Sequence, residues 1–450
     1  MKIKSGLIAS TVVAALGGLL FGFDTAVISG TTVWLQNVFA LSPSGLGFSV
    51  ASALIGTIVG AITIGGPVDK YGRRKILFVL AALYFVSAVG SALAWDWYSF
   101  LIFRFLGGLG VGGSSVTAPM YIAEISPAKL RGRLVAVTQL NIVFGILLAY
   151  LSNYVIAGMN LGELEWRWMF GVEAFPAVMF FLLLFLNPRS PRWLIAQNRI
   201  NEAREVLAKC GTDTGNIEEE INEIQASLDT EHHSLREPLL QKKYYKPISL
   251  AMVIAIFNQL SGVNAVLYYA PHIIRMAGAG DESALLQSIV VGATNLIFTI
   301  AALGVIDRFG RKFLMVIGSV GYIVSLMTMG ITFYLYGTNF TKTSGLIVLI
   351  SMMVFVASHA FGQGSVIWVY ISEIFPNRIR ARGQALGSST HWFMAAIVSW
   401  TFPVIAQVSG GHAFSFYAVC MVGQLLWVIF VMPETKGITL EQMQKKFGIE

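Results

Sequence analysis

Apolar runs of about twenty residues recur twelve times along this 450-residue chain. They cover residues 7–28, 48–68, 76–93, 98–122, 134–157, 169–186, 248–269, 286–306, 313–335, 346–370, 386–406 and 414–432. A helix needs about 20 residues to cross a hydrocarbon core about 30 Å thick. Because lipid offers no hydrogen bonds, each run must satisfy its own backbone, which favours helices. The runs predict an all-α membrane protein with twelve transmembrane helices that lie in a lipid bilayer.

Composition and local patterns exclude several other classes of protein. Charged residues make up 12% of the chain, against about 25% in soluble domains, which is too few to cover a water-exposed fold of this length. The run at 7–28 is too long for a secretory leader and lacks an A-x-A cleavage site, so we expect a retained first helix. With two cysteines, the sequence predicts no disulfide framework, no metal site and no cofactor.

Basic residues gather in the connections on one side of the predicted membrane. If the N-terminus is cytoplasmic, three basic residues remain in the outer connections, namely Arg167, Arg275 and Lys342. This positive-inside bias predicts a multi-pass protein of the cytoplasmic membrane with both termini cytoplasmic. The net charge of +7 therefore reflects orientation, and we expect no nucleic-acid partner.

The chain divides into two similar halves. One long polar segment separates six runs from six, and it contains amphipathic stretches at 201–209 and 216–228. We predict an N-terminal six-helix bundle (1–187), a cytoplasmic helical linker (188–246), a C-terminal six-helix bundle (247–432) and a cytoplasmic tail (433–450). Three motifs recur at offsets of 238, 249 and 245 residues, and they begin at Asp69 and Asp307, Glu124 and Glu373, Pro188 and Pro433. Such duplication is typical of transporters in which two pseudo-symmetric bundles rock about a central site.

The repeated motifs place carboxylates beside arginines at the cytoplasmic helix ends. Charge-assisted pairs that form when the bundles close on that side would stabilise an outward-open state. The alternative is that the cations only anchor the topology. The predicted cytoplasmic gate consists of Asp69, Arg73, Arg74, Glu124, Arg131, Asp307, Arg311, Glu373 and Arg380. Because Leu303 stands where the first copy has Gly65, we expect the two halves to gate unequally.

Further motifs follow in order along the chain: G-G-x-x-F-G-F-D at 17–24, P-x-Y-x-x-E at 119–124, S-P-R-W at 190–193, Q-x-x-G-x-N-x-x-x-Y-Y at 259–269 and P-E-T-K-G at 433–437. With the two basic loops, they make the chain similar, over essentially its whole length, to the sugar porters of the major facilitator superfamily. That group contains bacterial sugar–proton symporters and animal hexose facilitators. The resemblance implies transport of a sugar by alternating access.

Glycine motifs inside the runs indicate helix packing and not catalysis. The pattern G-x-G-x-x-G at 108–113 has no preceding strand, so it lacks the context of a dinucleotide site. Glycines four residues apart, at 18 and 22 and at 56 and 60, let membrane helices approach closely. The chain has no P-loop and no visible nucleophile–base–acid set, so we expect no enzyme activity and no ATP-driven transport.

Amides and aromatic residues within the runs suggest the kind of substrate. Buried polar groups in a membrane are costly, which favours a functional reason for them. Amides both donate and accept hydrogen bonds, as sugar hydroxyls do, so the set suits a small neutral sugar. The resemblance implies that the sugar-contacting positions are Phe21, Gln139, Asn258, Gln259, Asn264, Tyr268, Asn295, Trp368, His391 and Trp392. The alternative for any single amide is an interhelical hydrogen bond, which averages about 0.6 kcal/mol.

The chain departs from the usual pattern of the family at four of these or nearby positions. Asn258 replaces the first glutamine of a usual pair, and His391 replaces an asparagine or glutamine. Ser365 stands in place of a usual proline, and Ile146 stands where some pentose carriers have a second glutamine. The substrate class therefore stays open between a hexose and a pentose, with inositol or another polyol as the alternative.

Three ionisable residues interrupt the runs, and all lie in the first half. The helical rise places Asp24, Arg104 and Glu173 at a common depth of about 10 Å below the outer surface, which makes contact possible. A buried carboxylate beside an arginine is a plausible proton site, and the alternative is a static ion pair. In the family, symporters resemble this chain at these positions, whereas uniporters generally carry asparagine at position 24.

The sequence thus predicts a proton-coupled monosaccharide symporter that works as a monomer. Asp24 would carry the proton, with Arg104 as its modulator and Glu173 as a supporting carboxylate. The alternatives are an uncoupled sugar facilitator and a sugar-sensing receptor on a transporter scaffold. A sensor would be expected to carry a long signalling tail, whereas eighteen residues follow Met432.

Overall fold

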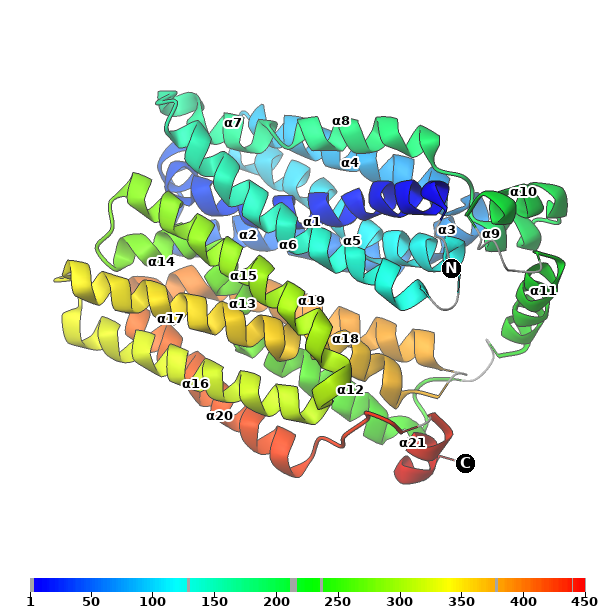
Figure 1. Cartoon of the computed structure of the whole chain (residues 1–450). Coiled ribbons are helices and arrows are strands. Elements are labelled where there is room, and N and C mark those ends of the chain that lie inside the picture. The colour runs from blue at the N-terminus through cyan, green and yellow to red at the C-terminus, as the bar shows by residue number, and fades with distance from the viewer. Residues whose placement is uncertain are drawn as a thin grey trace. The chain divides into compact units, whose positions relative to one another are not determined.

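The computed structural model describes residues 4–127, 130–210, 217–234, 238–376, 379–438 and 440–449. Within these ranges the regular elements are helices and no strand occurs, as Figure 1 shows. Twelve helical segments are long and apolar enough to cross a membrane. The predicted all-α architecture with twelve transmembrane helices is confirmed.

Nine of the twelve spans are single helices, and three are interrupted. The single helices are α1 (Ser5–Val38), α2 (Pro43–Thr63), α4 (Arg73–Ala92), α5 (Trp97–Ile125), α6 (Arg131–Ala157), α15 (Asp281–Phe309), α16 (Arg311–Tyr336), α19 (Arg380–Val408) and α20 (Gly410–Phe430). The interrupted spans are α7 (Glu165–Gly171) with α8 (Ala174–Leu183), α12 (Tyr245–Leu260) with α13 (Val263–Tyr268), and α17 (Lys342–Phe361) with α18 (Gln363–Ile374). The helix α14 (Ala270–Met276) continues the seventh span.

The three interruptions have local backbone causes that hydropathy did not predict. Gly262 has a left-handed φ of +84°, and a Cβ there would lie 2.5 Å from the Tyr417 ring. Gly362 is non-helical, with φ −90° and ψ −102°, and a Cβ there would lie 2.9 Å from Gly318 of α16. The sixth span breaks at a turn that ends in Glu173. The breaks at Gly262 and Gly362 therefore depend on the packing around them.

Short helices connect the spans and form the linker. They are α3 (Gly65–Tyr71), α9 (Pro191–Ala196), α10 (Ile200–Cys210), α11 (Ile217–Ser234) and α21 (Leu440–Phe447), with 3₁₀ turns at Gly162–Leu164, Leu184–Leu186 and Lys242–Tyr244. The linker helices predicted at 201–209 and 216–228 correspond to α10 and α11, whereas α9 was not predicted. The hydroxyl of Ser190 caps α9 by accepting from the Trp193 amide at 3.2 Å, and Trp193, Leu194, Ala203 and Leu207 form the buried centre of this segment.

Contacts divide the chain into two compact units that do not follow the sequence halves. Unit 1 comprises Met1–Thr25, Ile55–Ile146 and Phe170–Arg236, and unit 2 comprises Ala26–Leu54, Leu147–Met169 and Glu237–Glu450. Within unit 2, parts of the N-terminal helices pack on the C-terminal ones. A Cβ on Gly47 would lie 2.1 Å from the Trp400 carbonyl oxygen, and the Tyr150 hydroxyl donates to the Leu267 carbonyl at 2.6 Å. The division at 187 and 246 remains a prediction.

Within unit 1, the glycine pairs bring helices into backbone contact as their spacing predicted. A Cβ on Gly22 would lie 1.8 Å from the Ile142 carbonyl oxygen of α6, and one on Gly56 would lie 2.2 Å from the Phe105 carbonyl oxygen of α5. On the facing side, a Cβ on Gly145 would lie 2.1 Å from the Leu19 carbonyl oxygen. The α1–α6 contact therefore has no room for a methyl group.

Gly22→Ala should destabilise the protein by about 1–3 kcal/mol, because the methyl group would push α1 away from α6. Gly304→Ala is the matched control, since Gly304 also lies inside a helix but a Cβ there meets nothing within 4 Å. The control should be neutral or slightly stabilising because alanine is the better helix former. Thermal midpoints in detergent measure both, and equal midpoints for the two variants would contradict the close contact.

Candidate functional site

Asp24 and Arg104 form a buried ion pair between α1 and α5. Arg104 Nη1 lies 2.5 Å from Asp24 Oδ1, and Nη2 lies 3.3 Å from Oδ2 and 3.2 Å from the Asp24 carbonyl oxygen. The two residues are 2% and 1% exposed. Two parallel charge-assisted bonds fix both the distance and the orientation of the pair. The structure thus brings together two of the three predicted coupling residues.

The first helix ends later than the depth estimate for Asp24 assumed, although the contact with Arg104 occurs. The helix α1 continues to Val38, ten residues beyond the predicted end at 28. Asp24 therefore lies fourteen residues, and not six, before the end of its helix. The polar end of the helix, residues 31–38, was left out of the apolar run because hydropathy alone does not detect a helix that continues past its apolar run.

Glu173 completes this group at the break between α7 and α8. Its side chain is 1% exposed, and neither carboxylate oxygen has a hydrogen-bond partner among the described residues. Its charge interacts with those of Asp24 and Arg104. Burial of an ionised carboxylate without a donor costs several kcal/mol, so the neutral acid is the less costly form at this position.

Two features of the charged group were missed by the sequence analysis. The glycine at 107 leaves room for the Ser87 hydroxyl, because a Cβ there would lie 2.3 Å from Ser87 Oγ. The same Cβ would be in ordinary contact with the carboxylate, 3.4 Å from Asp24 Oδ1. Below it, the hydroxyls of Tyr84 and Ser114 lie 2.8 Å apart. The glycine-rich pattern of residues 107–113 was the available signal, but it had been assigned to helix packing alone.

Unit 2 contains a second polar group, built around the break of the seventh span. Gln259 Nε2 lies 3.1 Å from Asn258 Oδ1 and 3.1 Å from His391 Nε2. The His391 ring lies 5.0 Å from the Trp368 ring and 4.9 Å from the Trp392 ring, centre to centre. The structure thus brings five predicted sugar-contacting residues together from α12, α18 and α19.

Some polar atoms in this group have no protein partner. Gln259 Oε1 and Asn264 Nδ2 are buried without a hydrogen bond within the described part of the chain. Trp368 is 39% exposed, whereas Gln259 is 1% exposed. Buried polar atoms are nearly always paired, so unpaired ones indicate a missing ligand or water. An exposed indole, an unpaired amide oxygen and an unpaired amide N–H are chemically suited to a polyol.

The remaining predicted sugar residues lie at several places. Tyr268 ends α13 and is buried, and Asn295 of α15 accepts a long bond of 3.5 Å from Thr299. Phe21 and Gln139 are partly buried and belong to unit 1. Their place in one site with the residues of unit 2 remains a prediction.

The predicted gate residues of the first half form a cluster at the start of α4. Arg73 Nη2 lies 2.9 Å from Glu124 Oε1 and 3.3 Å from Asp69 Oδ1. Glu124 also accepts from the Ser190 hydroxyl at 2.5 Å. Arg74 donates to the carbonyls of Leu184 and Phe185, and Arg131 donates to that of Ala123. These bonds tie α4 to α5 and to the end of the sixth span.

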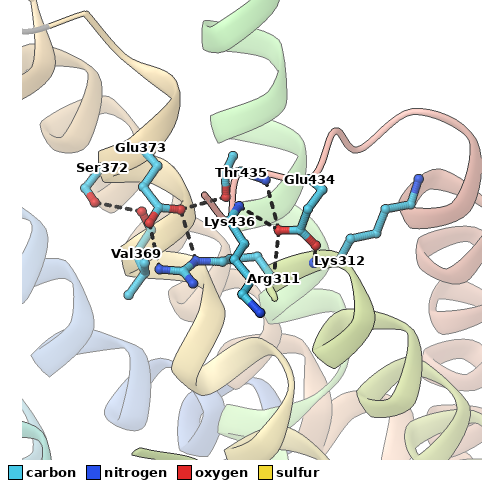
Figure 2. A network of polar contacts seen from close by, with 8 residues as sticks. All are labelled: Arg311, Lys312, Val369, Ser372, Glu373, Glu434, Thr435 and Lys436. Carbon is cyan, nitrogen blue, oxygen red and sulfur yellow. Dashed lines mark hydrogen bonds and ion pairs between the residues drawn. The ribbon is translucent and has the colours of Figure 1, made fainter. Parts of the chain in front are cut away.

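The second half repeats this cluster at the start of α16. Figure 2 shows Arg311 bound to Glu373 through two bonds of 2.7 and 3.1 Å, with the Thr435 hydroxyl donating to the same carboxylate at 2.6 Å. Glu434 accepts from the amides of Arg311 and Lys312, each at 3.0 Å, and so caps the helix. The side chain of Asp307 lies outside the described residues, and Arg380 begins α19.

The pairs described here join helices of the same half. Arg73 and Glu124 both belong to unit 1, and Arg311 and Glu373 both belong to unit 2. Each cluster therefore braces the helix ends of its own half. A role in closing one half against the other remains a prediction.

These features define a membrane transporter with a buried ion pair in one group of helices and an amide and indole site in another. A model of the family "Sugar (and other) transporter" matches residues 10–447. The chain therefore belongs to this sugar transporter family, a transporter family and not an enzyme family, within the major facilitator superfamily.

Individual relatives align over nearly the whole chain. The D-xylose-proton symporter of Escherichia coli (strain K12) is 40% identical over 98% of this chain and 96% of its own length. The arabinose-proton symporter of Bacillus subtilis (strain 168) is 36% identical over 96% and 93%. The inward open conformation of the xylose transporter XylE from E. coli matches with a TM-score of 0.86 at 38% identity, over 98% of this chain and 99% of that one.

The ion pair predicts a specific pattern of stability. Arg104→Gln and Asp24→Asn should each cost about 3–5 kcal/mol, because each leaves one buried charge unpaired. The double variant Asp24→Asn with Arg104→Gln should recover most of the loss, since two neutral amides can bond each other. Thermal midpoints in detergent measure this coupling. Arg204→Gln, at the exposed pair with Glu218 in the linker, is the control and should leave the midpoint unchanged. Additive losses in the double variant would contradict the pairing.

The cap at α16 predicts a pH dependence of stability. Burial raises the pKa of Glu434, but the amides of Lys436, Arg311, Lys312 and Thr435 outweigh it and hold the pKa below its ordinary value of 4.5. The stability contributed by Glu434 is therefore present above that value and is lost as the pH falls through the folded-state pKa. Glu434→Gln should lower the thermal midpoint near neutral pH, and the difference from the wild type should shrink in acid. The exposed Glu219→Gln should follow the wild-type profile, and a constant difference for Glu434→Gln would contradict the cap.

Proposed function

We propose that this protein couples the uptake of a neutral monosaccharide, a hexose or a pentose, to the entry of a proton across the cytoplasmic membrane by alternating access. The observation that carries the proposal is the buried Asp24–Arg104 pair beside the unpaired carboxyl of Glu173. Relatives described as D-xylose-proton and arabinose-proton symporters support it. The chain is proposed to work as a monomer with both termini in the cytoplasm.

Asp24 is the proposed proton carrier because its carboxylate is paired with the guanidinium of Arg104, which lies on another helix. The Arg104 guanidinium, 2.5 Å from the carboxylate of Asp24, compensates its charge. If the helices shift and the pair lengthens, the buried carboxylate loses its compensation and takes up a proton. Glu173 is close enough to influence both charges, and it supports the exchange as a nearby acid.

The sugar is proposed to occupy the surface formed by Gln259, Asn264 and Trp368. The unpaired Gln259 Oε1 accepts a hydroxyl proton, and Asn264 Nδ2 donates to a hydroxyl oxygen. The half-exposed Trp368 ring covers the apolar C–H face of the sugar. Because the group offers no cation, it favours a neutral ligand over an anionic one.

The charge clusters at the starts of α4 and α16 are proposed to act as the cytoplasmic gate. Arg73–Glu124 and Arg311–Glu373 brace equivalent helix ends in the two halves. If these ion pairs are intact in one transport state and altered in another, they change the free-energy difference between the two states.

Replacing Asp24 by asparagine tests the coupling. In vesicles with an imposed pH gradient, the variant should lose uphill accumulation of labelled xylose, arabinose or glucose, because no proton can load at position 24. Sugar counterflow, which needs no net proton movement, should persist at a similar rate. Glu163→Gln, at an exposed acid in the connection before α7, is the control and should accumulate sugar normally.

The same assay separates the alternatives. Accumulation that survives in Asp24→Asn would contradict the role of Asp24. Wild-type uptake that ignores the pH gradient would instead indicate an uncoupled facilitator. Uptake of inositol in preference to every monosaccharide would indicate a polyol symporter.

A further inference from the structure

A buried polar network crosses the C-terminal helices. We define it as Ser319, Tyr322, His359, Gln363 and Gln424. Tyr322 Oη lies 2.5 Å from His359 Nδ1 and donates to Gln363 Oε1 at 3.5 Å. Gln363 Nε2 donates to Gln424 Oε1, and Gln424 Nε2 donates to Ser319 Oγ at 2.9 Å. The network joins α16, α17, α18 and α20.

Burying the polar side chains of this network costs free energy unless each of them is hydrogen-bonded. Ser319, Tyr322, Gln363 and Gln424 are each 0% exposed. An amide placed in an apolar interior must find partners, and one left without them costs about 1–3 kcal/mol. Apolar side chains of the same size would pack these helices without the cost of an unpaired polar group. The polar set therefore suggests that its hydrogen bonds fix the position of one helix against the others.

Gln363 occupies a special place in this network. It is the first residue of α18 and directly follows Gly362, the break of the tenth span. At that break the backbone of α17 no longer determines where α18 points. Ser365 spans the break by donating to the Ala360 carbonyl at 2.5 Å, and the amide of Gln363 ties the first turn of α18 to α16 and α20.

The helix that Gln363 anchors carries Trp368. Trp368 lies five residues further along α18, with its ring 5.0 Å from that of His391. His391 in turn contacts Gln259 at 3.1 Å. A rotation of the short helix α18 would carry the indole away from both residues.

We propose that Gln363 is a positioning residue for the sugar site, and that its bonds to Tyr322 and Gln424 set the place of Trp368 across the break of the tenth span. The proposal rests on the proposed function, because it takes Trp368 as a sugar contact. Gln363 itself is buried, and we assign it a role in positioning Trp368 and not a contact with the sugar. Gln424 and Ser319 act through it.

Gln363→Leu removes both amide bonds at nearly constant size. Sugar counterflow should show a KM raised about tenfold, the equivalent of one lost buried hydrogen bond, with a maximal rate that changes little. Quenching of tryptophan fluorescence by the sugar should shift to higher concentration to the same extent. A purely structural role would lower the thermal midpoint and the amount of active protein, and would leave KM unchanged.

A pair of serines on α16 provides the matched control. Ser319 and Ser325 are both buried, and both donate to carbonyls of their own helix. Ser319 also accepts from Gln424, whereas no bond to another helix is seen for Ser325 among the described residues. Ser319→Ala should therefore raise KM in the same direction as Gln363→Leu but less, and Ser325→Ala should not.

Two further variants keep the outcomes distinct. In Gln363→Leu, the amide of Gln424 loses its partner. The double variant Gln363→Leu with Gln424→Leu removes that amide as well, so it should regain thermal stability while KM stays high. The double variant also serves for the test if the single variant does not fold. Trp368→Ala should raise KM strongly. A normal KM for Trp368→Ala would overturn the proposed sugar site. A raised KM for Trp368→Ala, together with a normal KM for Gln363→Leu and for the double variant, would overturn only the role of Gln363.

Discussion

The bond between Asp24 and Arg104 is the interaction on which the rest of the N-terminal half depends. Neither charge can be buried alone at an acceptable cost, so α1 and α5 must hold them within contact distance. The glycines of α1 and α5 make this possible, because they let α1 approach α6 and α5 approach α2 with backbone contact. The pair is costly to break and is held by closely packed helices. This is why we propose that a small helix movement at the pair is coupled to the uptake or release of a proton.

The two halves use the same framework with different chemistry at the starts of α4 and α16. Arg73 with Glu124 and Arg311 with Glu373 are equivalent pairs. After the equivalent prolines, however, the first half has Arg189 where the second has Glu434. Glu434 caps α16, whereas Arg189 lies 3.8 Å from Glu202 of the linker. The next residue in each half, Ser190 or Thr435, makes the same bond to its glutamate, Glu124 or Glu373. The starts of α4 and α16 are therefore stabilised differently, and unequal gating of the two halves stays a prediction.

Sequence reasoning predicted the number of spans, the repeat and the contact of Asp24 with Arg104, because each follows from hydropathy, spacing or the cost of buried charge. It could not predict the ends of α1 or the break beside Glu173, because these depend on packing and not on local composition. The link between Gln259 and His391, 132 residues apart, had no sequence signal beyond their chemistry. The network of Gln363 was missed for the same reason, since its members come from four helices.

Residues with proposed roles lie beside the three breaks in the membrane-spanning helices. Each break lies beside a residue with a proposed role: Glu173 at the sixth span, Gln259 and Asn264 on either side of Gly262, and Gln363 next to Gly362. Irregular backbone within a membrane is tolerated where protein or a water-filled cavity surrounds it. A break frees a short helix to take its own orientation, and it also removes the bonds that would have fixed that orientation. Side chains such as Gln363 must then supply the lost constraint, and this accounts for a buried amide pair in an otherwise apolar bundle.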